Sequence, residues 1–195
     1  MPVTQVNMVN LANLDSKLTV NRAFNFVFGL RGPKKRPSAQ LANSLVRLTD
    51  KTIHEHQLAQ KELADFVKRQ SIISFFRAQG HLENCILSLS RAINFADVVK
   101  KAGLRLPDGS PLIPRGNIEL MSTRVRHRIK NLRDAIVHGD ERVIKSAIKA
   151  GNPIALNPDN NGLSLEGISV TYEELGRWLR QLHALAVRIN QYQEQ

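Results

Sequence analysis

The feature that most constrains this chain is a spacing of three or four residues between its apolar side chains. The spacing recurs in three stretches, at Leu41, Leu45, Leu48 and Thr52, at Leu82, Ile86, Leu89, Ile93 and Ala96, and at Met121, Val125, Ile129, Leu132 and Ile136. It matches the 3.6-residue turn of an α-helix and places each set on one face. We therefore predict long amphipathic helices that bury these faces against one another.

Capping and breaking residues set the expected bounds of these helices. Ser38 is a plausible N-cap for a helix that continues, whole or broken, through "QLAQKELADFVKRQSIISFF". A second helix is expected over about 80–102, before Gly103, and a third from about 118 to His138. The proline-rich segment between these two helices is expected to be a loop, and "DERVIKSAIKAG" a short helical piece.

The last third of the chain carries a β-hairpin pattern. In "PIALNPDNNGLSLEGISV" the turn-forming residues of Asn-Pro-Asp-Asn-Asn-Gly separate two β-prone runs. Thr171 then opens the final helix, with Glu174 three residues later as in a capping box. The predicted fold class is all-α, a helical bundle with a small β-hairpin insertion before the last helix.

The domain organisation predicted from composition is simple. Residues 1–37, which end in the basic stretch "RGPKKRPS", are expected to form an N-terminal arm or linker of uncertain order. Residues 38–195 are expected to form the bundle. No apolar run approaches the roughly 20 residues that span a bilayer, and the N-terminus lacks a signal-peptide pattern, so we expect a cytoplasmic protein.

Charge points to a polyanionic partner. The chain has 28 Lys and Arg against 17 Asp and Glu, a net charge of +11. This excess favours RNA, DNA or anionic lipid. Nucleic acid is favoured over a membrane because no helix has a strongly apolar face with a basic rim. The single Cys85 excludes an intramolecular disulfide, and His54 and His56 lie on different faces of a helix, so no metal or other cofactor is expected.

The third predicted helix combines cations with an apolar face. Arg133 lies at the margin of that face, with Arg126 and Lys130 on its outer side, so the three form a basic strip suited to phosphate. On an unbroken helix His138 lies about 140° from Arg133. A shared site therefore requires either local unwinding at Gly139 or a second copy of the chain.

Arginine and histidine together are suited to RNA cleavage without a metal. Histidine can exchange a proton near neutral pH, and arginine can stabilise charge on phosphoryl oxygens. Glu83 and Asp134 are the carboxylates expected to orient them. The alternatives remain open: Arg133 could form a structural ion pair with Glu83 or Asp134, and His138 could be a cation at a helix C-terminus.

The stretch "RIKNLRDAIVHGDERV" resembles the signature of HEPN-domain proteins, a helical superfamily. Arg133 matches the family's arginine, Asp134 its polar follower and His138 its histidine. Asparagine is common where this chain has Asp134, and no tyrosine closely follows the histidine. "FFRAQGHLENCILSLSRAI" is similar to the family's earlier helix, with Glu83 in the place of its acidic residue.

The resemblance implies a homodimer and a metal-independent endoribonuclease that cleaves RNA by transesterification at the dimer interface. It also implies a toxin or phage-defence effector with a possible antitoxin partner. RNA contacts are expected from Arg126, Lys130, Arg128 and Arg124, although such a basic face can also be merely solvated. One alternative is a catalytically inactive HEPN-like protein that binds nucleic acid or acts as a scaffold. Another is a purely structural helical module.

Overall fold

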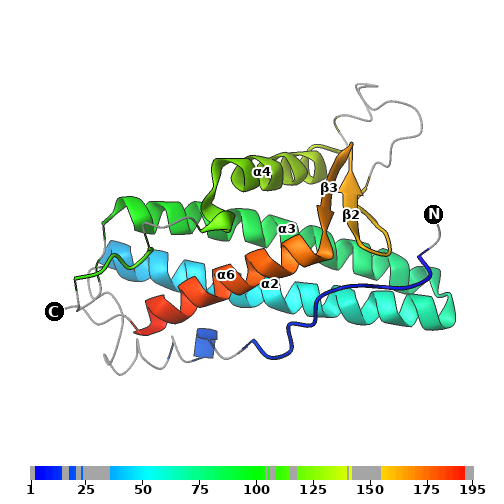
Figure 1. Ribbon diagram of the computed structural model, residues 1–195, viewed down its shortest axis with the longest axis horizontal. Coiled ribbons are helices and arrows are strands. Elements are labelled where there is room, and N and C mark those ends of the chain that lie inside the picture. The colour runs from blue at the N-terminus through cyan, green and yellow to red at the C-terminus, as the bar shows by residue number, and fades with distance from the viewer. Residues whose placement is uncertain are drawn as a thin grey trace.

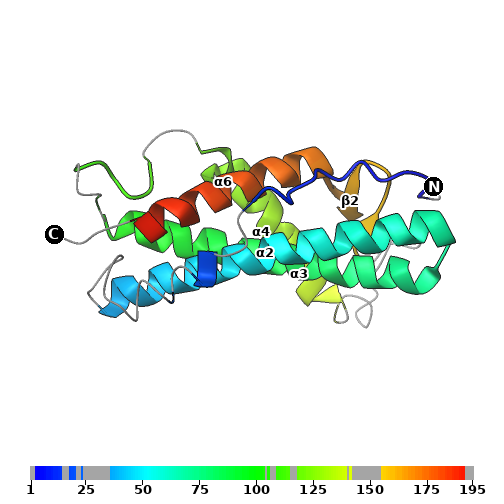
Figure 2. The ribbon, with the colours of Figure 1, turned by 90° about the horizontal axis from the view of Figure 1, so that it is seen from below.

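Two long antiparallel helices form the frame of the molecule (Figure 1). They are α2, Arg36–Arg69, and α3, Ile72–Lys101, and they pack against each other along their length (Figure 2). The computed structural model describes residues 3–14, 18–20, 23, 36–103, 105, 109–114, 118–139, 141 and 155–191.

The break between the two long helices lies at Gln70 and Ser71. Gln70 has a positive φ of 54°, and the Ser71 side chain caps α3 by accepting from the Ser74 amide. The stretch predicted as one long or broken helix is therefore broken here, and α3 begins at Ile72 rather than near residue 80. Its end agrees with the prediction, with the C-cap at Ala102 followed by Gly103 at φ 66°.

Two further helices cover this frame. A 3-10 turn, η1, Glu119–Met121, leads into α4, Thr123–Val137, which lies along α3, while α6, Tyr172–Gln191, packs on α2 (Figures 1 and 2). The predicted apolar face of α3 is buried at Leu82, Ile86, Leu89, Ile93 and Ala96, and α6 buries Leu175, Trp178, Leu179 and Leu182. The predicted helical bundle is confirmed.

A small antiparallel sheet precedes α6. Its strands are β1, Asn157–Pro158, β2, Gly162–Leu165, and β3, Ile168–Thr171, in the order β1-β2-β3. The turn predicted over residues 157–162 is shorter in the structure, because Asn157 and Pro158 form β1 and Gly162 begins β2. A second turn at Glu166 and Gly167, with φ of 51° and 80°, adds the third strand. The capping box is confirmed, because the Thr171 hydroxyl accepts from the Glu174 amide and the Glu174 carboxylate accepts from the Thr171 amide.

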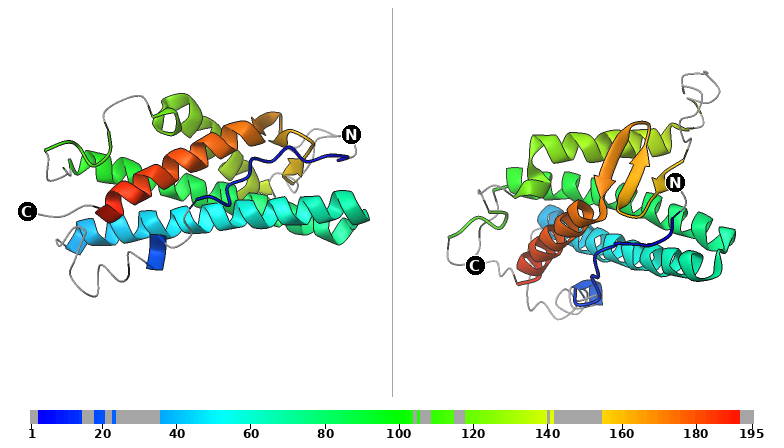
Figure 3. Two further views of the ribbon diagram at one scale, coloured as in Figure 1. Left: turned by 60° about the horizontal axis from the view of Figure 1, so that its bottom comes forward. Right: turned by 45° about the vertical axis from the view of Figure 1, so that its right-hand side comes forward.

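The first described residues of the chain pack against the bundle. Residues 3–14 run between α6 and α2 (Figure 3). Gln57 and Gln60 of α2 donate to the carbonyls of Leu11 and Met8, at 3.3 and 3.2 Å. Leu11 is fully buried. Most of the remainder of the predicted arm, including residues 31–35 of its basic stretch, lies outside the described residues, as does nearly all of the predicted short helix over 140–151.

Three polar or thiol side chains have clear positions in this core. Cys85 is fully buried, and burial raises the pKa of its thiol. His56 is also buried, which lowers its pKa to about 4, whereas His54 is exposed. His81 lies within α3 and its Nδ1 is 2.7 Å from Glu55 Oε2 on α2, so it joins the two long helices. None of the described helices combines the length and apolar character needed to cross a membrane.

Candidate nucleic-acid interface

A cleft of about 350 Å³ lies between α3 and α4. Ser122 starts α4 by accepting from the Val125 amide, and Val125, Ile129 and Leu132 bury its inner face. The outer edge of that face remains open and forms one wall of the cleft. We call this the α3/α4 cleft, and its lining residues are Ser90, Ile93, Asn94, Thr123, Arg126, His127, Ile129, Lys130 and Arg133.

Three cations follow this edge of α4. Arg126, Lys130 and Arg133 are four and three residues apart, a spacing that keeps helical side chains on one side. The predicted basic strip is therefore present. Lys130 is exposed and forms no ion pair with any described residue. Arg126 Nη1 lies 3.2 Å from Asp97 Oδ1 of α3.

Asp97 is shared between two cations. Lys101 Nζ lies 2.9 Å from its other carboxylate oxygen. The hydrogen bond from Lys101, followed by the charge of Arg126, lowers the pKa of Asp97. One carboxylate thus faces both Lys101 and Arg126, and the rim of the cleft stays positive. The charge and shape together suit a ligand that carries phosphate.

Arg133 pairs with its neighbour in the chain. Its Nε donates to Asp134 Oδ1 at 2.8 Å, and its Nη2 contacts the same oxygen. Of the two structural ion pairs considered from sequence, a single chain forms the one with Asp134. Both side chains are about one-third exposed. Ion pairs of this exposure contribute roughly 0–1 kcal/mol, so a phosphate can compete for the guanidinium.

His138 lies at the C-terminal end of α4, away from the cleft. It is the C-cap, with φ −108° and ψ 14°, and its amide donates to the Asp134 carbonyl at 3.0 Å. The ring is half exposed, and its Nδ1 is 3.7 Å from Glu141 Oε1. His138 does not line the α3/α4 cleft with Arg133. A single chain does not bring the predicted pair together there.

Glu83 serves a different contact from the one expected. Its carboxylate accepts from the Leu156 amide at 3.4 Å, while Gln79, one turn earlier, donates to the Leu156 carbonyl at 2.6 Å. Desolvation raises the pKa of Glu83, and the hydrogen bond from Leu156 partly opposes this. Glu83 and Gln79 therefore hold the segment that leads into β1, and Glu83 makes no ion pair with Arg133 in a single chain.

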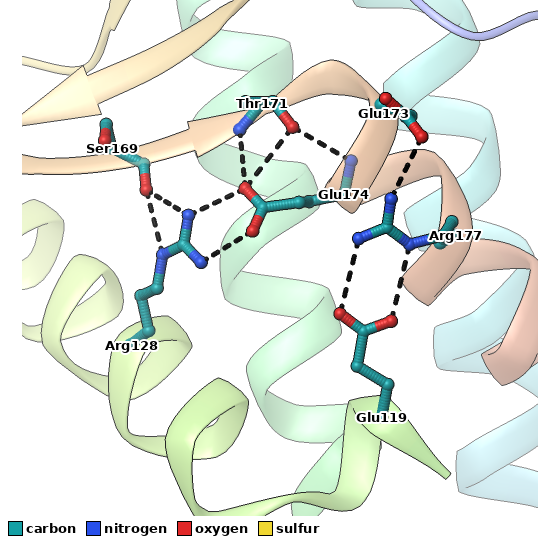
Figure 4. Close-up of polar contacts among 7 residues, drawn as sticks. All are labelled: Glu119, Arg128, Ser169, Thr171, Glu173, Glu174 and Arg177. Carbon is teal, nitrogen blue, oxygen red and sulfur yellow. Dashed lines mark hydrogen bonds and ion pairs between the residues drawn. The ribbon is translucent and has the colours of Figure 1, made fainter.

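Arg128 is fixed inside the fold (Figure 4). Its Nε and Nη2 donate to the Ser169 carbonyl of β3, and its Nη1 and Nη2 donate to the two oxygens of Glu174, at 2.9 and 2.7 Å. The guanidinium also lies 5.6 Å from the centre of the Trp178 ring. Arg128, among the predicted RNA contacts, thus fastens α4 to β3 and α6.

Glu174 is held by two groups at once. The hydrogen bond from Arg128, with a further one from the Thr171 amide, lowers the pKa of Glu174 to about 2. Beside this pair, Arg177 bridges Glu119 of η1 and Glu173 of α6 (Figure 4). Arg124, the remaining predicted RNA contact, is exposed near the start of α4 and forms no ion pair with any described residue.

His127 is a cleft residue that the sequence reasoning missed. It is exposed, lines the α3/α4 cleft, and its Nδ1 lies 3.3 Å from Asn131 Nδ2. A helical projection contained the signal, because His127 falls about 60° from Lys130. The motif at Arg133 and His138 drew the prediction to the C-terminal half of the helix, whereas His127 lies in its N-terminal half. Ser90 and Asn94 of α3 were missed because two polar residues one turn apart have no distinctive pattern.

The molecule is thus a helical bundle with a small sheet and a basic cleft on one side of α4. Comparisons with protein-family models, with curated proteins and with solved structures gave no match. In the part of the chain that the structure describes, no group of three or more His, Cys, Asp or Glu side chains is placed to hold a metal ion.

Proposed function

We propose that this protein binds RNA along the α3/α4 cleft. The observation that carries the proposal is the row of Arg126, Lys130 and Arg133 along one wall, of which Lys130 has no carboxylate partner among the described residues. Ser90 and Asn94 on the other wall offer neutral hydrogen bonds to sugar or phosphate. The N–H donors of Arg128 are hydrogen-bonded within the fold, so Arg128 is not part of the proposed RNA surface. Arg124 is retained at the rim of the α3/α4 cleft.

We further propose that the bound RNA is cleaved without a metal, as the resemblance to HEPN proteins implies. The 2′-hydroxyl attacks the adjacent phosphorus and passes its proton to His138. The bond from phosphorus to the 5′-oxygen then breaks, and that oxygen takes up a proton from water, which leaves a 2′,3′-cyclic phosphate and a free 5′-hydroxyl; His138 afterwards returns its proton to the solvent. Arg133 stabilises the charge on the phosphoryl oxygens, and Asp134 orients Arg133. The protein acts as a toxin or phage-defence effector, with an antitoxin as its possible partner.

The distance between the cleft and the helix end is the reason to assign this chemistry to a homodimer. Arg133 lies in the cleft and His138 lies outside it. Val137, next to His138, is a large apolar side chain that is 54% exposed. A second copy packed on this end of α4 covers Val137 and brings its own motif to the site.

A second candidate is an RNA-binding protein or scaffold without catalysis. The contact that favours it is the pairing of Arg133 with Asp134, which occupies the Nε and Nη2 donors of the guanidinium within the chain. In that case the basic cleft is the whole functional surface, and His138 only caps α4 with a favourable charge near the helix C-terminus.

One experiment separates the candidates. The protein is incubated with cellular RNA in EDTA, and the wild type is compared with His138→Ala and with His54→Ala, an exposed histidine on α2 that serves as the matched control. Loss of cleavage only in His138→Ala, with RNA binding retained, supports the nuclease. Salt-dependent binding without cleavage by the wild type supports the scaffold. Absence of RNA binding at low salt rejects both and leaves a structural helical module.

A further inference from the structure

The turn between α2 and α3 exposes a cluster of large apolar side chains. Ile72, Ile73 and Phe76 are 57%, 61% and 62% exposed. They make up half of the exposed large apolar side chains in the described residues, and they lie within the first turns of one helix. Ile72 and Phe76 are four residues apart and so lie on one side of α3, and exposed apolar side chains grouped in this way are typical of a contact with another molecule. We call residues 68–77 the hairpin tip.

The hairpin tip extends beyond the rest of the bundle. In two perpendicular views the ends of α2 and α3 that meet there lie past α4, α6 and the sheet (Figures 1 and 2). The tip is also held in shape. The rings of Phe66 and Phe75 pack with centres 5.2 Å apart, and the Ser74 hydroxyl donates to Asp65 at 2.9 Å. The exposed side chains are therefore presented from a fixed backbone.

Cations lie to one side of this apolar cluster. A shallow pocket beside it is lined by four cations, Lys61, Lys68, Arg69 and Arg77, and by only two carboxylates, Glu62 and Asp65. Asp65 is already paired with Arg69, at 2.9 Å, and with Ser74. Lys68 and Arg77 form no ion pair with any described residue. The tip thus combines an apolar centre with a positive rim.

We propose that the hairpin tip docks on an anionic lipid surface. Ile72, Ile73 and Phe76 enter the interfacial region, and Lys68 and Arg77 contact lipid phosphates. A second copy of the chain is a poorer occupant because two positive rims repel each other. A convex tip is better suited to a fluid interface than to a preformed protein groove. The proposal is independent of the RNA cleft, whose α3 residues Ser90, Ile93 and Asn94 lie roughly four or more helical turns further along α3.

This proposal reverses the expectation from sequence that no membrane contact is made. That expectation rested on the absence of a strongly apolar helix with a basic rim. The rim and the apolar centre here come from the ends of two helices, and the break at Gln70 that joins them was not located from sequence. Periodicity along a single helix cannot detect such a surface.

Vesicle sedimentation tests the proposal with the full chain. Neutral vesicles of phosphatidylcholine alone are compared with anionic vesicles. The anionic vesicles contain about 3 parts phosphatidylglycerol to about 7 parts phosphatidylcholine. The test variant is Ile72→Ser/Ile73→Ser/Phe76→Ser, which keeps every charge. The matched control is Val98→Ser, an exposed apolar residue elsewhere on α3.

We expect the wild type and Val98→Ser to bind the anionic vesicles at least about tenfold more tightly than the neutral ones, and the triple variant to lose about tenfold or more of that affinity. Equal binding by the triple variant would mean that only non-specific charge attraction operates, and it overturns the proposal. So does a failure of the wild type to bind anionic vesicles. Loss of self-association in the triple variant, without any vesicle binding by the wild type, assigns the tip to a second copy instead. An unchanged circular dichroism spectrum and an unchanged unfolding midpoint of the triple variant show that it is folded.

Discussion

Arg128 and Lys130 lie two residues apart on α4, yet one is enclosed by the fold and the other faces the α3/α4 cleft. The Arg128 side chain is 23% exposed and donates to Glu174 and to the Ser169 carbonyl. Lys130 is exposed and has no ion-pair partner among the described residues. Two residues correspond to about 200° of helical rotation, so they point to opposite sides. Positive charge alone therefore does not identify a ligand surface, and the partners of each cation must be counted.

The largest expected difference between the Arg128 side and the Lys130 side of α4 is in stability. Arg128→Ala removes the guanidinium donors from Glu174 and from the Ser169 carbonyl and leaves Glu174 only its bonds from Thr171, and we expect it to lower the free energy of unfolding by about 2 to 3 kcal/mol. Lys130→Ala is the matched control and should change it by no more than about 0.5 kcal/mol. Urea unfolding followed by circular dichroism measures both. Equal stability of the two variants would show that the contacts of Arg128 do not stabilise the fold more than those of Lys130.

RNA affinity should show the reverse pattern. Lys130→Ala/Arg133→Ala removes two phosphate contacts from the cleft, and we expect about a tenfold loss of affinity and a flatter dependence on salt, by about one to two in slope. The control is Arg47→Ala, an exposed arginine on α2, away from the cleft. Fluorescence anisotropy over a series of salt concentrations gives both quantities. A loss of the same size in Arg47→Ala would show that RNA follows overall charge rather than the cleft.

The stability that the Arg128–Glu174 pair provides should also depend on pH. The pKa of Glu174 is about 2 in the folded protein and near 4.5 in the unfolded chain, so the stabilisation is complete above pH 4.5 and is lost as the pH falls toward 2. Because Glu174 is partly exposed, we expect about 1 kcal/mol after solvent screening.

Urea unfolding of the wild type and Glu174→Gln at pH 6, 4 and 3 isolates this contribution. His56 titrates in both proteins and cancels in the difference. A difference between the two that does not shrink from pH 6 to pH 3 would contradict the role of the carboxylate.

The smallest expected effect concerns the pair inside the cleft. Asp134→Asn removes the carboxylate that holds Arg133, so the guanidinium is freed for phosphate and RNA binding should tighten by about threefold. Asp159→Asn, at an exposed turn of the sheet, is the control for the loss of one negative charge. If the two variants bind RNA equally well, Asp134 acts only through its net charge.

Much of the fold was predictable because it follows from local chemistry. The apolar spacing located α2, α3 and α4, and Thr171 with Glu174 located the start of α6. Two breaks were missed or imprecisely placed, at Gln70 and at Glu166, because non-glycine residues with positive φ have no reliable signal in sequence. The site was less predictable. The basic strip was predicted, but the contacts of Arg128 within the fold were not. They depend on β3 and Trp178, which are distant from Arg128 in the chain.

The packing of residues 3–14 has a consequence for the order in which the chain can fold. The Thr4 amide donates to the Asn160 side chain, 156 residues away, and Val9 fits against Gly176 of α6, where a Cβ atom would lie only 2.8 Å from Val9 Cβ. Contacts over such separations form late, after the entropy of closing a long loop has been overcome. Residues 3–14 can therefore pack only after the sheet and α6 have been synthesised. During synthesis, α2 and α3 can pair before that.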